Sequence, residues 1–162
     1  QLPDDRRQIL DPHTAYQITS MMEGVVQRGT ATIIKQIVPN VPFAGKTGTT
    51  DEMRDAWFLG FTPSLVAGVW VGFDKERTLG KQEVGGRAAA PIWLYFMEQS
   101  LRGTPVDVFP VPEGIVFTKV ERATGQPVKG TSKTAIFECF LDDALPGESG
   151  EGNTPAGAAK SD

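Results

Sequence analysis

Apolar side chains recur every three or four positions in two parts of the chain, which is the spacing of helices that bury one face. The first run follows an Asp11-Pro12 pair, typical of a helix start, and predicts a helix over residues 12–27: Ala15, Ile18, Met22, Val25 and Val26. A second, short helical or irregular segment is predicted over residues 31–36. The last run predicts a helix over residues 89–101, with Trp93 and Phe96 in the core: Ala89, Ile92, Trp93, Phe96, Met97 and Leu101.

Between these helices, β-branched and aromatic residues gather in short runs, which is typical of strands. Strands are predicted over residues 43–50, 56–61 and 65–73, and Thr62-Pro63-Ser64 is short enough to join the last two as an antiparallel hairpin. Residues 81–87 are predicted to form a glycine-containing loop. The fold class that follows is α+β, an antiparallel sheet flanked by helices.

The C-terminal third has a different pattern. Residues 104–112 hold three prolines and are predicted to be extended. Strands are predicted over residues 114–121 and 135–141, and residues 126–129 could return beside the first of them. From Pro146 onward glycine, serine, alanine, proline and charged residues dominate, which predicts a disordered tail. We therefore expect three parts: 1–103, 104–145 as a small β-rich extension, and 146–162.

Composition excludes several classes of function. The net charge of −4 argues against nucleic acid or an anionic membrane surface as the main partner. One cysteine, Cys139, excludes an internal disulfide, and we expect it to be a small buried apolar residue. One histidine, His13, cannot build a metal cluster, so no metal or other cofactor is expected. The longest apolar run, residues 65–73, is too short to cross a bilayer, so this segment is expected to make no membrane contact.

The chemistry gathers in Phe43-Ala44-Gly45-Lys46-Thr47-Gly48-Thr49-Thr50. A phosphate-binding loop would need a glycine where Asn40 stands and a helix after Lys46-Thr47, but the residues that follow are glycine or β-branched. A strand edge carrying Lys-Thr-Gly is favoured instead. This triplet belongs to the Ser-x-x-Lys, Ser-x-Asn, Lys-Thr-Gly set of penicillin-binding proteins and serine β-lactamases.

A longer series of motifs narrows the resemblance. Lys-Thr-Gly is followed by Asp55-Ala56-Trp57-Phe58-Leu59-Gly60, then Gly68-Val69-Trp70-Val71-Gly72, then Gly85-Gly86-Arg87-Ala88-Ala89-Ala90-Pro91. In this order they resemble the end of the transpeptidase domain of class A, bifunctional penicillin-binding proteins of the 1A type, over roughly residues 10–145. The resemblance implies that residues 1–103 are the C-terminal part of that domain, and that Arg28-Gly29-Thr30 lies near the site. A simple helix stop explains that turn with nothing more, and is the favoured interpretation.

The resemblance also implies roles for the Lys-Thr-Gly strand in a serine acyl-transfer site. Strand alternation puts Thr47 and Thr49 on one face, where two hydroxyls could bind a substrate carboxylate. The Thr49 N–H would be one oxyanion donor, and Gly48 would let the ligand approach the strand. Lys46 would supply a fixed positive charge, reaching the site around the strand edge from the opposite face. Lys46 and Thr49 are thus the catalytic candidates, and Thr47, Gly48 and Thr49 the substrate-binding ones.

The chain departs from the family at its nucleophile. No serine has lysine three positions later, and no Ser-x-Asn occurs. We therefore expect both motifs upstream of Gln1, in a part of the same protein that also carries a membrane anchor, and we expect this chain alone to be inactive. The implied partners are peptidoglycan stem peptides and β-lactams, on the periplasmic side of the bacterial cytoplasmic membrane. The alternatives are a serine β-lactamase or D,D-carboxypeptidase fragment, and a non-catalytic module that binds cell-wall peptide.

Overall fold

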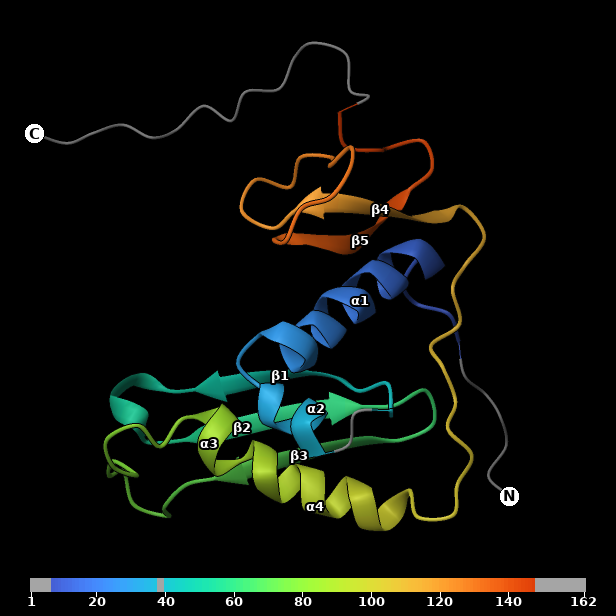
Figure 1. Ribbon diagram of the computed structural model, residues 1–162. Coiled ribbons are helices and arrows are strands. Elements are labelled where there is room, and N and C mark those ends of the chain that lie inside the picture. The colour runs from blue at the N-terminus through green and yellow to red at the C-terminus, as the bar shows by residue number, and fades with distance from the viewer. Residues whose placement is uncertain (1–6, 38–39, 148–162) are drawn as a thin grey trace, which may run out of the picture. The chain divides into compact units, whose positions relative to one another are not determined.

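The computed structural model describes residues 7–37 and 40–147 of the chain, which divides into two compact units, Gln1–Val111 and Pro112–Asp162. The first unit holds two helices, a three-stranded sheet and two further helices in that order (Figure 1). The second unit holds a pair of strands.

Helix α1 spans Pro12–Arg28 and starts as its sequence predicts. The Asp11 carboxylate accepts hydrogen bonds from the backbone N–H groups of His13 (3.0 Å) and Thr14 (3.1 Å), and Pro12 occupies the first turn. A short second helix, α2, covers Thr32–Ile37. Both helices were expected within one residue or two of these bounds.

The N-cap of α1 should contribute measurably to stability. Asp11→Ala is expected to lower the melting temperature, because two N–H groups lose their acceptor. Asp11→Asn should retain most of the stabilisation, because its side-chain oxygen can still accept. The Thr14 N–H, helped by the His13 N–H and imidazole, lowers the pKa of Asp11 from its usual value of 3.8. A lowered folded-state pKa stabilises the protein above the unfolded pKa, and that stabilisation is lost as the pH falls through the folded pKa.

Thermal melting followed by circular dichroism at neutral and at strongly acidic pH checks the cap. The wild-type protein should lose more of its melting temperature in acid than Asp11→Asn does. Equal melting temperatures for Asp11→Ala and the wild-type protein at neutral pH would contradict a stabilising role for this cap.

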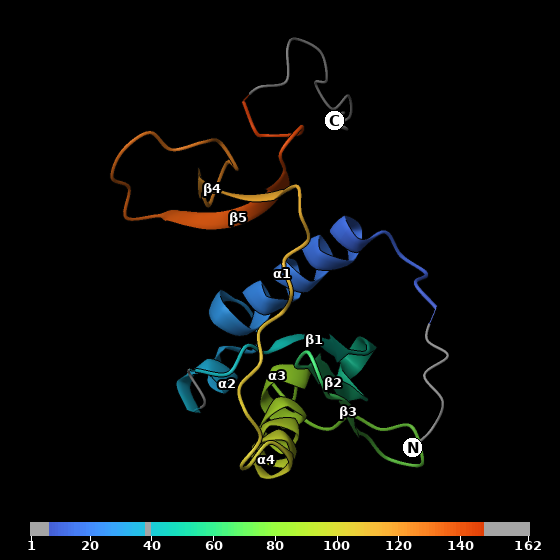
Figure 2. The same ribbon diagram turned by 90° about the vertical axis from the view of Figure 1, so that its right-hand side faces the viewer.

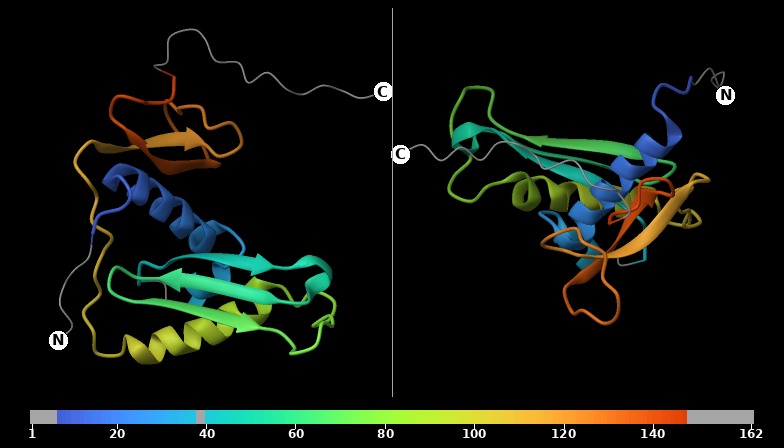
Figure 3. Two further views of the ribbon diagram at one scale, coloured as in Figure 1. Left: turned by 180° about the vertical axis from the view of Figure 1, so that it is seen from behind. Right: turned by 90° about the horizontal axis from the view of Figure 1, so that it is seen from above.

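The sheet consists of β1 (Ala44–Thr49), β2 (Ala56–Phe61) and β3 (Val66–Val71), antiparallel and in that spatial order (Figure 3, left). A 3-10 turn, Asp51–Met53, joins the first two strands. Lys46 and Thr47 therefore lie inside a strand and open no helix. This confirms the strand prediction and makes the phosphate-loop alternative wrong.

The two faces of the sheet have different surroundings. Alternate residues point to an inner face that the core covers, so Ala56, Phe58 and Gly60 are buried. The intervening residues point to an outer face, where Trp57 (49% exposed) and Trp70 (46% exposed) pair across β2 and β3. This alternation is the expected period of two for a sheet with one covered face.

Helix α4 (Ala90–Ser100) covers the inner face, while α1 packs beside β1 (Figure 2). Trp93 of α4 lies at the centre of the core, fully buried, with its ring against Phe43 and Phe58. The prediction that Phe96 belongs to the core is wrong, because it is 49% exposed. The buried stripe of α4 is narrower than the apolar run: Ala90, Trp93, Leu94 and Met97.

The loop predicted over residues 81–87 is partly wrong. Residues Gly85–Ala88 form a short helix, α3, which leads into α4. The sequence did not predict this helix, because it begins with two glycines and glycine has a low helix propensity. Contacts with the sheet, described below, hold this helix where its intrinsic propensity would not.

The second unit is built on β4 (Ile115–Glu121) and β5 (Ala135–Leu141). These strands pair antiparallel without interruption, from Ile115 opposite Leu141 to Glu121 opposite Ala135. Both strands were predicted, and an isolated bridge between Val120 and Pro127 fits the expected return of residues 126–129. Cys139 is half-buried, so the expectation of a buried residue is wrong. The predicted disordered tail lies mostly outside the described residues, which end at Gly147.

Candidate active site

The Lys-Thr-Gly run lies in the middle of β1, with its side chains divided between the two faces of the sheet. Lys46 is exposed and pairs with Leu59 on the outer face, whereas Thr47 and Thr49 share the inner face with Phe58 and Ala56. The Lys46 Nζ donates to the Thr47 carbonyl oxygen at 2.8 Å. The ammonium group is therefore held close to the main chain of β1.

The hairpin hydrogen bonds determine where the main chain of this strand points. The Thr50 N–H donates to the Asp55 carbonyl at 3.1 Å, which makes this a hydrogen-bonded pair at the end of the ladder. Bonded pairs then alternate with non-bonded ones, so Thr49 stands in a non-bonded pair with Ala56. The N–H of Thr49 points away from β2, and no residue in the described part of the chain accepts from it.

Both threonine hydroxyls take part in contacts that hold the strand. Thr47 Oγ1 lies 2.9 Å from Thr30 Oγ1, and Thr49 Oγ1 accepts from the Gly85 N–H at 3.1 Å. Because a hydroxyl both accepts and donates, Thr49 Oγ1 can receive the Gly85 N–H and still donate to a ligand carboxylate. The contact with Gly85 therefore leaves the hydroxyl hydrogen of Thr49 free to be donated.

The glycine pair at the start of α3 allows this helix to approach the strand. A Cβ on Gly85 would lie 2.2 Å from the Trp57 carbonyl oxygen and 2.6 Å from that of Gly48. A Cβ on Gly86 would lie 2.3 Å from the Thr30 carbonyl oxygen. Backbone atoms cannot move aside as a flexible side chain can, so only glycine fits at both positions.

Gly85→Ala is expected to destabilise the first unit by about 1–3 kcal/mol or more, because the new methyl group collides with two backbone carbonyls. Gly68→Ala is the matched control. Its Cβ would meet only the end of the Leu59 side chain, at 3.0 Å, so we expect a change within about 0.5 kcal/mol. Urea unfolding followed by circular dichroism compares them, and equal midpoints would contradict the close packing of α3.

Asp55 stabilises the turn of the β1–β2 hairpin. Its carboxylate accepts from the Trp70 indole N–H at 2.9 Å and from the Thr50 hydroxyl at 3.1 Å. The neighbouring Arg54 pairs with Glu52 and Glu76. Asp55, directly before β2, thus connects Trp70 of β3 with Thr50, the residue that follows β1.

Sequence reasoning missed these supporting residues, with one exception. The resemblance implied that the Gly29-Thr30 turn lies near the site, although a helix stop was the favoured interpretation, and Thr30 contacts Thr47. Nothing in the local sequence of Asp55 or Gly85 indicated a contact with β1. Within the described ranges, no three His, Cys, Asp or Glu side chains are grouped in a way that could hold a metal ion.

Comparison with known proteins decides the family. The family described as "Penicillin binding protein transpeptidase domain" matches residues 1–98. The chain belongs to this family. Penicillin-binding protein 1A of Pseudomonas aeruginosa is 39% identical over 147 residues, which cover 89% of this chain and 17% of that relative. Penicillin-binding protein 1A of Rickettsia bellii is 42% identical over 132 residues, covering 82% and 16%.

The fold comparison agrees with the family. The crystal structure of penicillin-binding protein 1A from Haemophilus influenzae matches with a TM-score of 0.76 and 28% identity, over 88% of this chain and 22% of that one. The chain spans about a sixth of the length of the Pseudomonas aeruginosa and Rickettsia bellii relatives. None of the helices that the structure describes is long and apolar enough to span a membrane.

Proposed function

We propose that this chain supplies the Lys-Thr-Gly wall of a serine D,D-transpeptidase site that cross-links peptidoglycan stem peptides. The observation that carries the proposal is the Thr49 N–H, which points away from β2 beside an exposed lysine. Such a donor can stabilise the oxyanion that forms when a serine attacks a carbonyl. The substrate peptide would lie along this edge of β1 as an added strand.

Each residue of the strand has a role in this proposal. The Lys46 ammonium stabilises the negative charge that develops during acylation. The Thr47 and Thr49 hydroxyls bind the substrate carboxylate, and Gly48 leaves room for the ligand. The supporting observation is that Thr47 and Thr49 share one face of β1 while their main-chain groups point away from β2.

The nucleophile belongs to a segment that this sequence does not contain. In the proposed reaction a serine of a Ser-x-x-Lys motif attacks the D-Ala-D-Ala carbonyl, and the terminal D-Ala leaves with the proton. An amine of a second peptide then attacks the acyl-enzyme, which restores the serine hydroxyl and forms the cross-link. A penicillin would acylate the same serine. The site would act on the periplasmic side of the cytoplasmic membrane, where an upstream segment anchors it.

The first unit has a surface suited to that missing segment. Large apolar side chains on the outer face of the sheet are about half exposed: Trp57, Leu59, Val66 and Trp70. In the described part of the chain, β3 pairs with β2 alone, so its second edge carries unpaired N–H and C=O groups. A segment carrying the serine motifs could cover both the face and the edge.

Labelled penicillin tests the proposal. The chain alone should take no label, whereas the chain joined to the part of a relative that carries Ser-x-x-Lys and Ser-x-Asn should form a stable adduct at that serine. Labelling of a serine in this chain would contradict the proposal, as would an inert joined protein that is folded.

A non-catalytic module that binds cell-wall peptide is the second candidate, because the free edge of β1 can take up an extended peptide without a serine nucleophile. For such a module, the chain alone should bind stem peptide as tightly as the joined protein does. Weaker binding by the chain alone would argue against it.

A further inference from the structure

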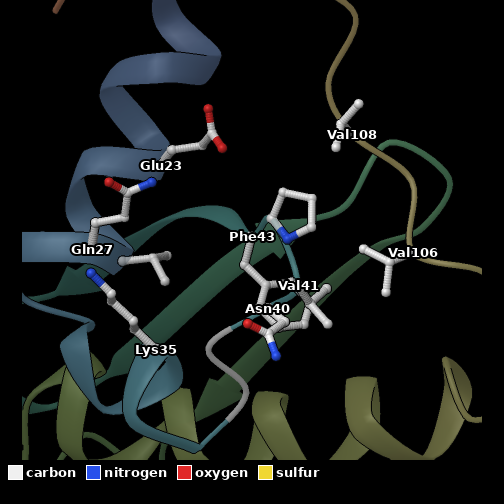
Figure 4. A pocket seen from close by; sticks show the side chains of 10 residues that line it. Glu23, Gln27, Lys35, Asn40, Val41, Phe43, Val106 and Val108 are labelled. Carbon is white, nitrogen blue, oxygen red and sulfur yellow. The ribbon is translucent and has the colours of Figure 1, made fainter. Parts of the chain in front are cut away.

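A cavity of about 390 Å³ opens between α1, α2 and the segment that enters β1 (Figure 4). Four of the side chains that line it are polar: Glu23, Gln27, Lys35 and Asn40. Figure 4 shows Glu23 and Gln27 projecting from α1 and Lys35 from α2 toward the same space. None of them belongs to the Lys-Thr-Gly strand, so the cavity is separate from the candidate active site.

The other residues that line the cavity are apolar. Val41, Pro42 and Phe43 form its floor beside Val26, and Val106 and Val108 of the extended segment border it. A volume of this size falls in the range of small-ligand sites, about 300–1,000 Å³. An apolar wall that faces a few polar groups is the usual composition of such sites.

In the described ranges, the side chains of Glu23, Gln27, Lys35 and Asn40 make no hydrogen bond or ion pair with another residue. Glu23 is half-buried, and its burial raises the pKa of its carboxyl group. A partly desolvated carboxylate without a cation gains most from a ligand that brings one.

We propose that this cavity binds a short zwitterionic peptide with apolar side chains, the size of a dipeptide. The peptide ammonium pairs with Glu23 and its carboxylate with Lys35. The Gln27 and Asn40 amides each offer a donor and an acceptor to the peptide bond. The apolar side chains of the ligand pack against the floor formed by Val41, Pro42 and Phe43.

Each part of this assignment corresponds to one feature of the ligand. A ligand without the ammonium leaves Glu23 unpaired, and one without the carboxylate leaves Lys35 unpaired. A dipeptide of glycine keeps both charges but loses contact with the apolar floor. Binding that needs all three features separates this site from a surface that merely attracts ions.

Isothermal titration calorimetry on the full chain tests the site, with leucyl-leucine as the probe. We expect saturable binding with a Kd in the millimolar range or tighter, weakened about tenfold by N-acetylation, by C-terminal amidation, or by replacing both leucines with glycine. Glu23→Gln and Lys35→Met should each weaken binding by a similar factor, and the exposed Glu98→Gln on α4 should not. These measurements are independent of any transpeptidase activity.

The absence of saturable binding would overturn the proposal. So would capped peptides that bind as tightly as leucyl-leucine, or a Glu98→Gln variant that weakens binding as much as Glu23→Gln. The capped peptides are measured on the wild-type chain, so this test does not depend on how well any variant folds.

Discussion

Replacing Trp93 by alanine is expected to lower the free energy of unfolding of the first unit by about 3–5 kcal/mol, the range typical of a buried aromatic residue. Trp93 is fully buried and packs edge-on against Phe43 and Phe58, with ring centroids 5.1 and 5.0 Å apart. Its indole N–H also donates to the Ala67 carbonyl at 2.9 Å. The substitution therefore leaves a large cavity and also removes the hydrogen bond that α4 makes to β3.

Trp57→Ala is the matched control for this prediction. It removes the same side chain from the outer face, where half of it already meets water, so we expect a loss of about 1 kcal/mol. Chemical unfolding followed by circular dichroism measures both variants. Equal losses of unfolding free energy would show that Trp57 stabilises the unit as much as Trp93 does. That result would contradict the division of the sheet into a buried and an exposed face.

Replacing Lys46 by alanine is expected to slow acylation of the intact domain by about a hundredfold, which corresponds to roughly 3 kcal/mol of transition-state stabilisation. The ammonium group donates to the Thr47 carbonyl in β1, two residues before Thr49, whose N–H we assign to the oxyanion. Its removal takes away a charge where negative charge develops. Second-order rate constants with a labelled penicillin measure the effect, and Lys81→Ala, at an exposed position outside β1, is the control.

Thr49→Ala should cost less than Lys46→Ala, nearer 1 kcal/mol, because the backbone donor remains and only a hydroxyl is lost. That hydroxyl also accepts from the Gly85 N–H, so folding of the variant has to be checked by circular dichroism. Wild-type rates in a folded Lys46→Ala variant would end the proposed role of this strand. A larger loss for Thr49→Ala would keep the site and reverse the ranking of its parts.

Local patterns were sufficient to predict most elements of this fold. Short runs of β-branched and aromatic residues locate β2 at its observed bounds, and the Asp11-Pro12 signal locates the start of α1. The errors occurred where tertiary contacts outweigh local preference. Phe96 satisfies the helical period but lies outside the stripe that the sheet covers, and α3 forms despite its glycines because the sheet holds it.

The site was predictable only as far as one strand determines it. Alternation correctly separates Lys46 from Thr47 and Thr49. The contacts of Thr30 with Thr47 and of Gly85 with Thr49 join residues 17 and 36 positions apart, and no local pattern encodes them. The cavity between α1, α2 and the start of β1 depends in the same way on how separate segments meet.

The composition of β3 has a consequence for handling the chain on its own. Val66–Val71 contains no charged residue and no proline, which are the features that usually keep an edge strand from pairing with a neighbouring molecule. Two copies could extend their sheets across this edge, with Val66 and Trp70 of each outer face forming a continuous apolar surface. The chain by itself should therefore associate as its concentration rises, and a lysine in place of Gly68, whose side chain would point to the exposed face, should keep it monomeric.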